Sequence, residues 1–166
     1  MWPRCQAAVD AAHQIIVAEA VTNQPPDPEH LVPMLVKTVD NCGATPEKLL
    51  GDAGYFSDNN VCEPQKWGID PYIATGRQRH DETPPTIRGR APHDMTVKEA
   101  MARKLATKAG KAVYSRRKVI VEPVFGHIKE ARGFRRFLLR GLQKVRGEWS
   151  LIALTHNLLK LHASSA

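Results

Sequence analysis

Short runs of β-branched and apolar residues recur along the first half of the chain and predict strands. Two such runs lie at Arg4–Val9 and Gln14–Thr22, and the few residues between them suffice for a hairpin turn. Shorter runs at Lys48–Leu50 and Asp70–Ala74 predict two further strands. The first half is therefore expected to contain a hairpin followed by two short strands.

Helical periodicity separates these strands. Apolar residues recur at a spacing of four between Asp27 and Gly43, which predicts a helix capped by the aspartate and ended by the glycine. Pro33 falls inside this helix, which is therefore expected to start late or to kink. Ser57 is predicted to cap a second helix that ends at Gly68. This order of strands and helices is typical of an α/β layered domain.

The periodicity is lost between residues 75 and 94, where prolines and arginines predict an exposed loop or insertion. Thr96 and Glu99 have the spacing of a capping box, in which each residue bonds the other's backbone N–H. A helix is therefore expected to begin there and to extend to Gly110.

The rest of the chain is predicted to be helical and basic. A long stretch covers Lys111–Arg132, with interruptions expected near Pro123 and Gly126. A final helix is predicted over Leu142–Leu161, with Trp149 interpreted as a core residue. Further apolar residues belong to or widen its predicted stripe: Val145, Leu151, Ile152, Leu154, Leu158, Leu159 and Leu161.

Charge is distributed unevenly along the chain. Residues 1–97 hold 8 Lys/Arg and 13 Asp/Glu, a net charge of −5, whereas residues 98–166 hold 16 and 4, a net charge of +12. A basic half of this strength indicates a polyanionic partner, most often nucleic acid, with a solvated helical surface as the alternative. No run approaches the roughly 18 apolar residues of a membrane helix, and the N-terminus lacks the pattern of a signal peptide. The three cysteines lack C-x-x-C spacing, which argues against a zinc site or a disulfide framework.

Two carboxylates are candidates for chemistry. Asp52 follows a predicted strand and precedes a glycine-containing turn, the position where open α/β sheets usually bind ligands; an ordinary turn aspartate is the alternative. Glu122 is either a salt-bridge partner or a metal ligand aimed into a cleft. Lys129 lies two helical turns further on and can share the face of Glu122. His127 and His156 are weaker candidates and are interpreted as packing or surface residues.

Two segments resemble the catalytic domain of bacterial insertion-sequence transposases, the DDE enzymes with an RNase H-like fold. These are GDAGYFS at 51–57 and YSRRKVIVEPVFGHIK at 114–129. In that family the aspartate of a D-x-G-Y-x-S segment and the glutamate of a Y-x-x-R…E…K helix are the second and third catalytic acids. Asp52 and Glu122 match those positions.

The helical signature matches at further positions, with one departure. Tyr114, Arg117 and Lys129 match its tyrosine, arginine and lysine. Four residues separate Arg117 from Glu122 where the family has three, and Lys118 has the spacing expected of the arginine.

The resemblance extends over nearly the whole chain and implies an α/β, RNase H-like fold with the first strand missing and a basic helical C-terminal half. It implies a strand and helix core at 1–74, a flexible loop or insertion at 75–95 and a basic helical part at 96–166 that carries the catalytic glutamate. The implied function is DNA transposition, with phosphodiester hydrolysis and transesterification at insertion-sequence ends and target DNA.

The implied cofactor is Mg²⁺ or Mn²⁺. Two divalent ions about 3.5–4 Å apart can hold the attacking and leaving oxygens of an in-line displacement, and carboxylates suit such ions. Asp52 and Glu122 are the implied metal ligands and are expected to converge on one cleft. Contacts to DNA are implied for Tyr114, Arg117, Lys129, Arg132, Arg135 and Arg136.

The family's first catalytic aspartate, on an earlier strand, has no counterpart, so the chain resembles the C-terminal part of a transposase and is expected to be inactive alone. Asp10 is the nearest replacement, although its position predicts a role in the hairpin turn. A non-catalytic DNA-binding remnant of a transposase is the alternative function. A bacterial cytoplasmic, nucleoid-associated location is expected, without a membrane partner, and a homodimer is left open.

Overall fold

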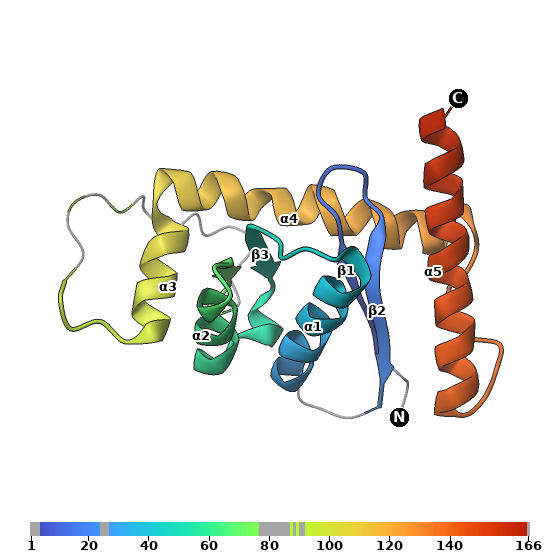
Figure 1. Ribbon diagram of the computed structural model, residues 1–166, viewed down its shortest axis with the longest axis horizontal. Coiled ribbons are helices and arrows are strands. Elements are labelled where there is room, and N and C mark those ends of the chain that lie inside the picture. The colour runs from blue at the N-terminus through green and yellow to red at the C-terminus, as the bar shows by residue number, and fades with distance from the viewer. Residues whose placement is uncertain (1–3, 24–26, 77–86, 88, 90–91, 166) are drawn as a thin grey trace. The chain divides into compact units, whose positions relative to one another are not determined.

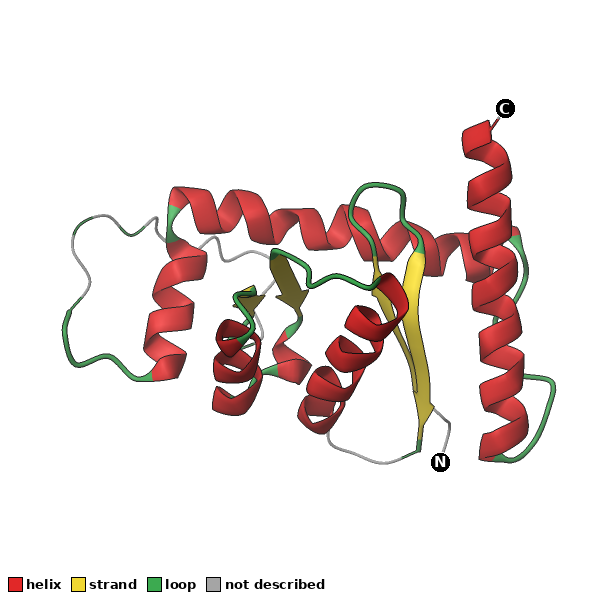
Figure 2. Ribbon diagram, viewed as in Figure 1, coloured by secondary structure: helices red, strands yellow, loops and turns green. Residues whose placement is uncertain are grey.

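The computed structural model describes residues 4–23, 27–76, 87, 89 and 92–165 (Figures 1 and 2). Its elements are β1 (Arg4–Val9), β2 (Ile16–Thr22), α1 (Leu31–Cys42), β3 (Lys48–Gly51), α2 (Asp58–Lys66), β4 (Asp70–Ile73), α3 (Val97–Ala106), α4 (Lys108–Gly126) and α5 (Leu142–Ser165). Short 3-10 helices cover Asp27–His30 and Ala53–Tyr55, and a π-helical turn covers His127–Ala131. The expected mixture of strands and helices, with a helical C-terminal half, is confirmed.

The chain divides into two compact units, each with its own sheet and core. We call the first the hairpin unit; it comprises Met1–Pro25, Met34–Gly43 and Lys118–Ala166. The second, the parallel-strand unit, comprises Pro26–Pro33 and Ala44–Arg117. In the hairpin unit β1 pairs with β2 in antiparallel fashion, and in the parallel-strand unit β3 pairs with β4 in parallel.

The turn of the hairpin is held by Asp10. Its Oδ2 accepts hydrogen bonds from the backbone N–H groups of Ala12 (3.1 Å) and His13 (2.7 Å). Its own N–H donates to the Ile15 carbonyl at 2.8 Å, which closes the loop. Asp10 therefore has the turn role that its position in the sequence predicts.

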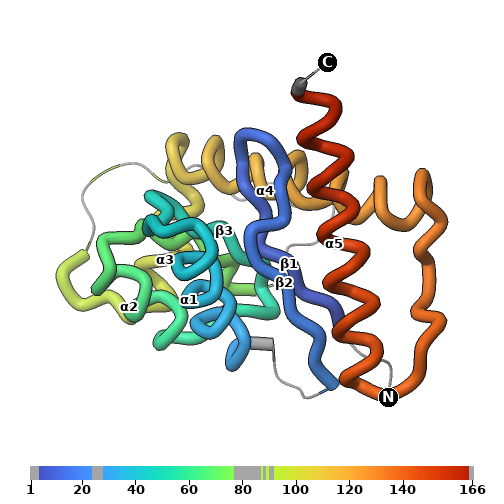
Figure 3. The backbone as a smooth tube through the Cα atoms, turned by 45° about the vertical axis from the view of Figure 1, so that its right-hand side comes forward, coloured from blue at the N-terminus to red at the C-terminus, as the bar shows by residue number. Residues whose placement is uncertain are grey.

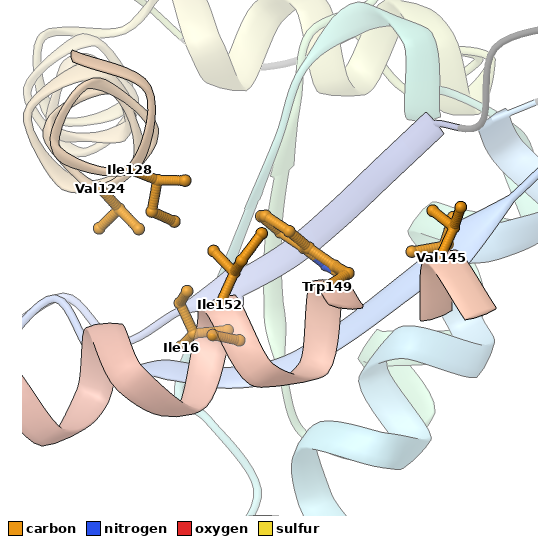
Figure 4. Packing of buried hydrophobic residues seen from close by; sticks show 8 residues of the cluster. Ile16, Val124, Ile128, Val145, Trp149 and Ile152 are labelled. Atoms are coloured by element: carbon orange, nitrogen blue, oxygen red, sulfur yellow. The ribbon is translucent and has the colours of Figure 1, made fainter. Parts of the chain in front are cut away.

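The core of the hairpin unit lies where α5 covers the hairpin, and Figures 1 and 3 both show α5 beside β2. Trp149 is 3% exposed and donates its indole N–H to the Gln6 carbonyl at 3.2 Å, which confirms it as a core residue. The buried cluster also draws on β2, α4 and the π-helical turn (Figure 4), and consists of Ile16, Val21, Val124, Ile128, Val145, Trp149, Ile152 and Ala153.

The outer side of α5 differs from the predicted stripe. Val145 and Ile152 are buried as expected. Leucines that the periodicity assigned to the same stripe are about half exposed or more, so that assignment is wrong for Leu151, Leu154, Leu158, Leu159 and Leu161. The apolar residues of α5 therefore surround much of the helix, and only one side of it meets the hairpin.

The parallel-strand unit is built by a short crossover between two strands. β3 runs into the 3-10 helix and α2 before β4 returns beside it, with Gly51 opposite Ile73. Ser57 caps α2 by accepting a hydrogen bond from Asn60 N at 3.1 Å, as predicted. Asn60 is buried and ties the crossover to the preceding segment through the Pro28 carbonyl. The core of this unit consists of Leu31, Val61, Ile73 and Met101.

The helix predicted to start at Thr96 begins as expected, but its predicted end at Gly110 is wrong. The capping box of Thr96 and Glu99 is complete, yet α3 ends at Ala106 because Thr107 adopts an extended backbone with ψ 158°. The Thr107 hydroxyl then accepts a hydrogen bond from Gly110 N at 2.9 Å and starts α4. A Cβ at position 110 would overlap the Lys104 carbonyl oxygen, so the corner between the helices requires glycine.

The start of α1 was predicted from the position of a proline. α1 begins late, as expected, because a 3-10 helix occupies Asp27–His30 and Pro33 falls in the first turn of α1.

The loop expected at 75–94 lies largely outside the described residues. Where the structure does describe the segment between β4 and α3, it contains no helix or strand.

Pro123 does not interrupt α4, contrary to prediction, whereas the change at Gly126 is confirmed because α4 gives way there to the π-helical turn. Proline has no N–H to donate to the carbonyl four residues earlier, which belongs to Val119. Gln14 replaces the missing donor: its Nε2 donates to the Val119 carbonyl at 3.0 Å. The helix therefore continues through Pro123 with a donor from the hairpin turn.

Gln14 also holds α5. Its Oε1 accepts a hydrogen bond from Lys160 Nζ at 2.8 Å, and its backbone carbonyl lies 3.1 Å from His156 Nε2. Its backbone is left-handed, with φ 58°, an arrangement that costs energy for a residue other than glycine. One residue of the hairpin turn thus contacts both α4 and α5.

We expect Gln14→Glu to destabilise the chain by about 1 kcal/mol, because the carboxylate cannot donate to the Val119 carbonyl. Pro123→Ala supplies the matched control, since the alanine N–H can donate to that carbonyl itself. In a double-mutant cycle measured by urea unfolding, Gln14→Glu should cost clearly less in the Pro123→Ala background. Equal costs in both backgrounds would show that Gln14 does not compensate for the proline.

His156 is buried between the hairpin turn and the π-helical turn. It is 0% exposed, and its ring meets the His127 ring edge-on with centroids 5.5 Å apart. Burial lowers the pKa of the His156 imidazole, and the nearby His127, Lys160 and Arg132 lower it further, although the Gln14 carbonyl opposes them. The lowered pKa favours the neutral imidazole, and because the Gln14 carbonyl can only accept, Nε2 is the ring nitrogen that donates to it.

We expect stability to fall as the pH drops from 8 to 5, through the ordinary histidine pKa of 6.5. Below that value the unfolded chain binds a proton that the folded imidazole resists, so stability present above it is lost. His156→Gln should flatten the dependence of the urea midpoint on pH. His13→Gln, at a side chain that is 75% exposed, should leave it unchanged. An unaltered dependence in His156→Gln would contradict the assignment.

Candidate functional site

Asp52 stands directly after β3 and starts the 3-10 helix Ala53–Tyr55. Its Oδ1 accepts a hydrogen bond from Gly54 N at 2.9 Å, so the carboxylate caps the turn. The residue is exposed, and a carboxylate with one such bond retains further lone pairs for a ligand. The capping role fits the ordinary turn interpretation, and the exposed position at the carboxyl end of a parallel strand also fits a ligand site.

Tyr114 and Arg117 lie in α4 within the same unit as Asp52. Burial raises the pKa of the Tyr114 hydroxyl; Arg117 lowers it, and the Asp52 carboxylate raises it. The Arg117 guanidinium lies 5.7 Å from the centre of the Tyr114 ring. The structure therefore brings together three residues that the sequence assigned to one site from two distant segments.

The Arg117 side chain has unused hydrogen-bonding capacity. Its Nε is buried, and it has no hydrogen-bond partner within the part of the chain that the structure describes. A buried donor left unpaired is unfavourable by about 1–3 kcal/mol.

Glu122 lies on α4 in the hairpin unit, one residue before Pro123. It is exposed, whereas the neighbouring Val124 is 1% exposed and anchors this stretch of the helix in the core. Asp52 belongs to the other unit, so the convergence of the two carboxylates on one cleft stays a prediction. The position of Glu122 is fixed through Val124 and through the hydrogen bond from Gln14 to Val119.

The donors available for a divalent metal are of the right type. Asp52 and Glu122 offer carboxylate oxygens, the ligands that Mg²⁺ prefers. Among the described residues, however, no three His, Cys, Asp or Glu side chains gather as a metal centre. The residues thus fit Mg²⁺ in chemistry but do not by themselves form a complete ligand set.

Three of the basic residues predicted to contact DNA line one pocket in the hairpin unit. Lys129, Arg135 and Arg136 stand at a cavity of about 280 Å³ that is lined by residues of β1, α4, the π-helical turn, the following loop and α5. All three residues are exposed, and Arg135 forms an ion pair with Glu130. The Lys129 ammonium lies 5.7 Å from the centre of the Phe125 ring, which keeps it beside the aromatic wall.

Arg132 serves the fold. Its guanidinium donates to the Ile152 carbonyl at 3.0 Å and to the Thr155 hydroxyl, and it lies 4.8 Å from the centre of the Phe134 ring. Burial lowers the pKa of this guanidinium. These contacts join the loop after α4 to α5, and the predicted contact of Arg132 with DNA stays a prediction.

The aromatic wall of the pocket was missed by the sequence analysis. Phe125 stacks on Trp149 with ring centroids 6.0 Å apart, and further lining comes from Phe134 and Phe137. Burial raises the pKa of the Cys5 thiol, at the same pocket, to about 11. The signal in the sequence was the alternation of aromatic and basic residues in GFRRF at 133–137, a pattern suited to nucleic acid.

None of the described helices is long and apolar enough to span a membrane.

No curated protein and no solved structure matches the chain. A family model described as the transposase DDE domain matches residues 78–162. The matched range covers just over half of the 166 residues and includes Tyr114, Arg117 and Glu122, although Asp52 precedes it. The chain therefore belongs to the transposase DDE domain family.

Proposed function

We propose that the chain is part of a DDE transposase of an insertion sequence, in which Asp52 and Glu122 are catalytic acids and ligands of Mg²⁺ or Mn²⁺. The family supports a function in DNA transposition in general. Bound metal would supply Lewis-acid activation of a phosphodiester and of the attacking hydroxyl. The partners are the DNA ends of the element and its target, which implies a bacterial nucleoid location.

The observation that carries this proposal is the grouping of Asp52 with Tyr114 and Arg117. The Asp52 carboxylate raises the pKa of the Tyr114 hydroxyl, so the GDAGYFS segment and the Y-x-x-R motif lie within electrostatic reach of each other. The Arg117 guanidinium, 5.7 Å from the centre of the Tyr114 ring, supplies positive charge beside them. A cation next to the carboxylate would help to hold a phosphate group there.

The pocket of the hairpin unit supports DNA as the partner. Its rim carries Lys129, Arg135 and Arg136, which suit phosphates, and its aromatic wall offers surfaces on which bases stack. Arg132, held against α5, would act through the position of the loop. Such contacts carry little sequence information, so we propose binding with weak sequence preference.

The RNase H-like fold, with Asp52 and Glu122 as two of its catalytic acids, is part of the same proposal. The two sheets of the described residues have two strands each, and sheets of this size are marginal alone. The fold that we propose would add a strand bearing the first acid. With Asp52 and Glu122 as its two matched acids, we infer that the chain binds DNA but does not cut it. The alternative function is a non-catalytic DNA-binding remnant. It predicts the same behaviour for this chain, but no cleavage activity after the strand is added.

We expect no Mg²⁺-dependent nicking of DNA by the 166-residue chain, because two carboxylates do not hold a metal pair in place. Addition of an upstream segment with an aspartate-bearing strand should produce nicking that Asp52→Ala or Glu122→Gln abolishes, measured on end-labelled element DNA. Thermal stability should rise with the same addition. Robust nicking by the chain alone that Asp52→Ala abolishes would show that the chain itself supplies the first acid, and Asp10 would be tested next.

We expect binding to duplex DNA to weaken steeply with salt, by about 0.9 in log K per log salt for each phosphate contacted. Lys129→Ala with Arg136→Ala should make the slope shallower by roughly two contacts. Lys66→Ala, at an exposed lysine paired with Glu63 in the net-negative half, is the control and should leave the slope unchanged. Fluorescence anisotropy over a salt series measures the slope of each protein. Equal slopes for wild type and the Lys129→Ala, Arg136→Ala variant would contradict the proposed interface.

A further inference from the structure

α5 has apolar residues on two opposite sides. Trp149 and Ile152 face the hairpin and are 3% and 4% exposed. On the other side four leucines remain 55–60% exposed, namely Leu151, Leu154, Leu158 and Leu161. At about 100° per residue these four positions fall on one stripe roughly opposite the buried one. One side of α5 is thus covered by its own unit, and the other presents leucines to solvent.

The exposed leucines, which we call the outer seam (Leu151, Leu154, Leu158 and Leu161), have the spacing of a coiled coil. The steps between them are three, four and three residues, the alternation that keeps a seam facing a partner helix. Gly147 continues the seam by four residues toward the start of α5; it is exposed, and a Cβ at this position would meet no heavy atom within 4 Å. A second helix can therefore approach this end closely.

Charge identifies the kind of partner. Between Trp149 and Ser164 the only Asp, Glu, Lys or Arg is Lys160, whose Nζ is held by Gln14 Oε1 at 2.8 Å. The outer seam therefore lacks cations for DNA phosphates, although the rest of this half of the chain is strongly basic. It equally lacks like charges that would repel another copy of itself.

The leucines are placed symmetrically along α5, which suits pairing with the same helix in the opposite direction. Leu154 and Leu158 are equidistant from position 156, and so are Leu151 and Leu161. A two-fold axis at that position places Leu154 against Leu158 of a second copy and Leu151 against Leu161 of that copy. Each contact is then repeated by symmetry, as a two-fold interface requires.

We propose that two copies of this chain associate through antiparallel pairing of their α5 helices along the outer seam. Four half-exposed leucines present a few hundred Å² per chain, a patch large for an isolated monomer. A standard stable interface buries about 800 Å² per partner, so the dimer should be reversible and form in the micromolar range. No residue of the proposed DNA site takes part.

The experiment uses the full chain in sedimentation equilibrium. Wild type should be a monomer–dimer equilibrium, and Leu154→Glu or Leu158→Lys alone should raise the dissociation constant at least about tenfold, because each leaves a charge against a leucine of the other copy. A mixture of the two variants should recover association, since antiparallel pairing sets the glutamate against the lysine and leaves a leucine pair at the symmetric contact. Parallel pairing would set each new charge against a leucine and would recover nothing.

The matched control is Leu138→Glu, the same change at a leucine that is 75% exposed and lies outside α5; it should associate like wild type. Circular dichroism of each variant checks that α5 remains folded. A wild-type chain that stays monomeric throughout the micromolar range overturns the proposal, and so does a mixture that associates no better than its parts. If wild type is monomeric and instead floats with phosphatidylcholine vesicles in a density gradient, the outer seam binds a lipid surface. That result would also overturn the proposed dimer.

Discussion

A single side-chain amide, that of Gln14, determines how the hairpin unit is assembled. Pro123 lies between the exposed Glu122 and the buried Val124, and it leaves the Val119 carbonyl without a helical donor. Gln14 supplies that donor from the hairpin turn and binds Lys160 of α5 with the other end of the same amide. The turn therefore fixes the helix that presents the candidate acid and the helix that covers the core. The backbone of Gln14 is left-handed, a strained conformation that persists only where the surrounding contacts fix it.

Local signals predicted most of the elements, because each is decided by residues a few positions apart. β1 has the predicted bounds, and the caps at Ser57 and Thr96 form as their spacing indicates. The predictions fail where periodicity carries no information. α3 ends because Thr107 adopts an extended backbone and its hydroxyl starts α4, and the continuity of α4 depends on Gln14, more than a hundred positions away. Neither contact leaves a periodic pattern in the sequence.

The candidate site shows the same division. The resemblance to the Y-x-x-R…E…K signature identified Tyr114 and Arg117, and an α-helix places positions three apart on one face. Their proximity to Asp52 came from the fold of the parallel-strand unit, which returns α4 to the end of β3. The aromatic wall of the basic pocket was not predicted, since Phe125 and Trp149 fit the pattern of core residues equally well. A residue at the edge of a core can serve both as packing and as the wall of a binding surface.

α5 shows why the amount of apolar surface in a helix is not enough to place it. Its leucines widen the apolar stripe beyond what one packing partner covers, and the hairpin, being only two strands wide, meets one side. A helix that is apolar nearly all round is stable in water only with cover on both sides. The outer seam is as regular as the buried one and is almost free of charge in the most basic half of the chain. Charge is readily tolerated on a solvated helix, so its absence there indicates that this side of α5 is a surface for contact with another helix.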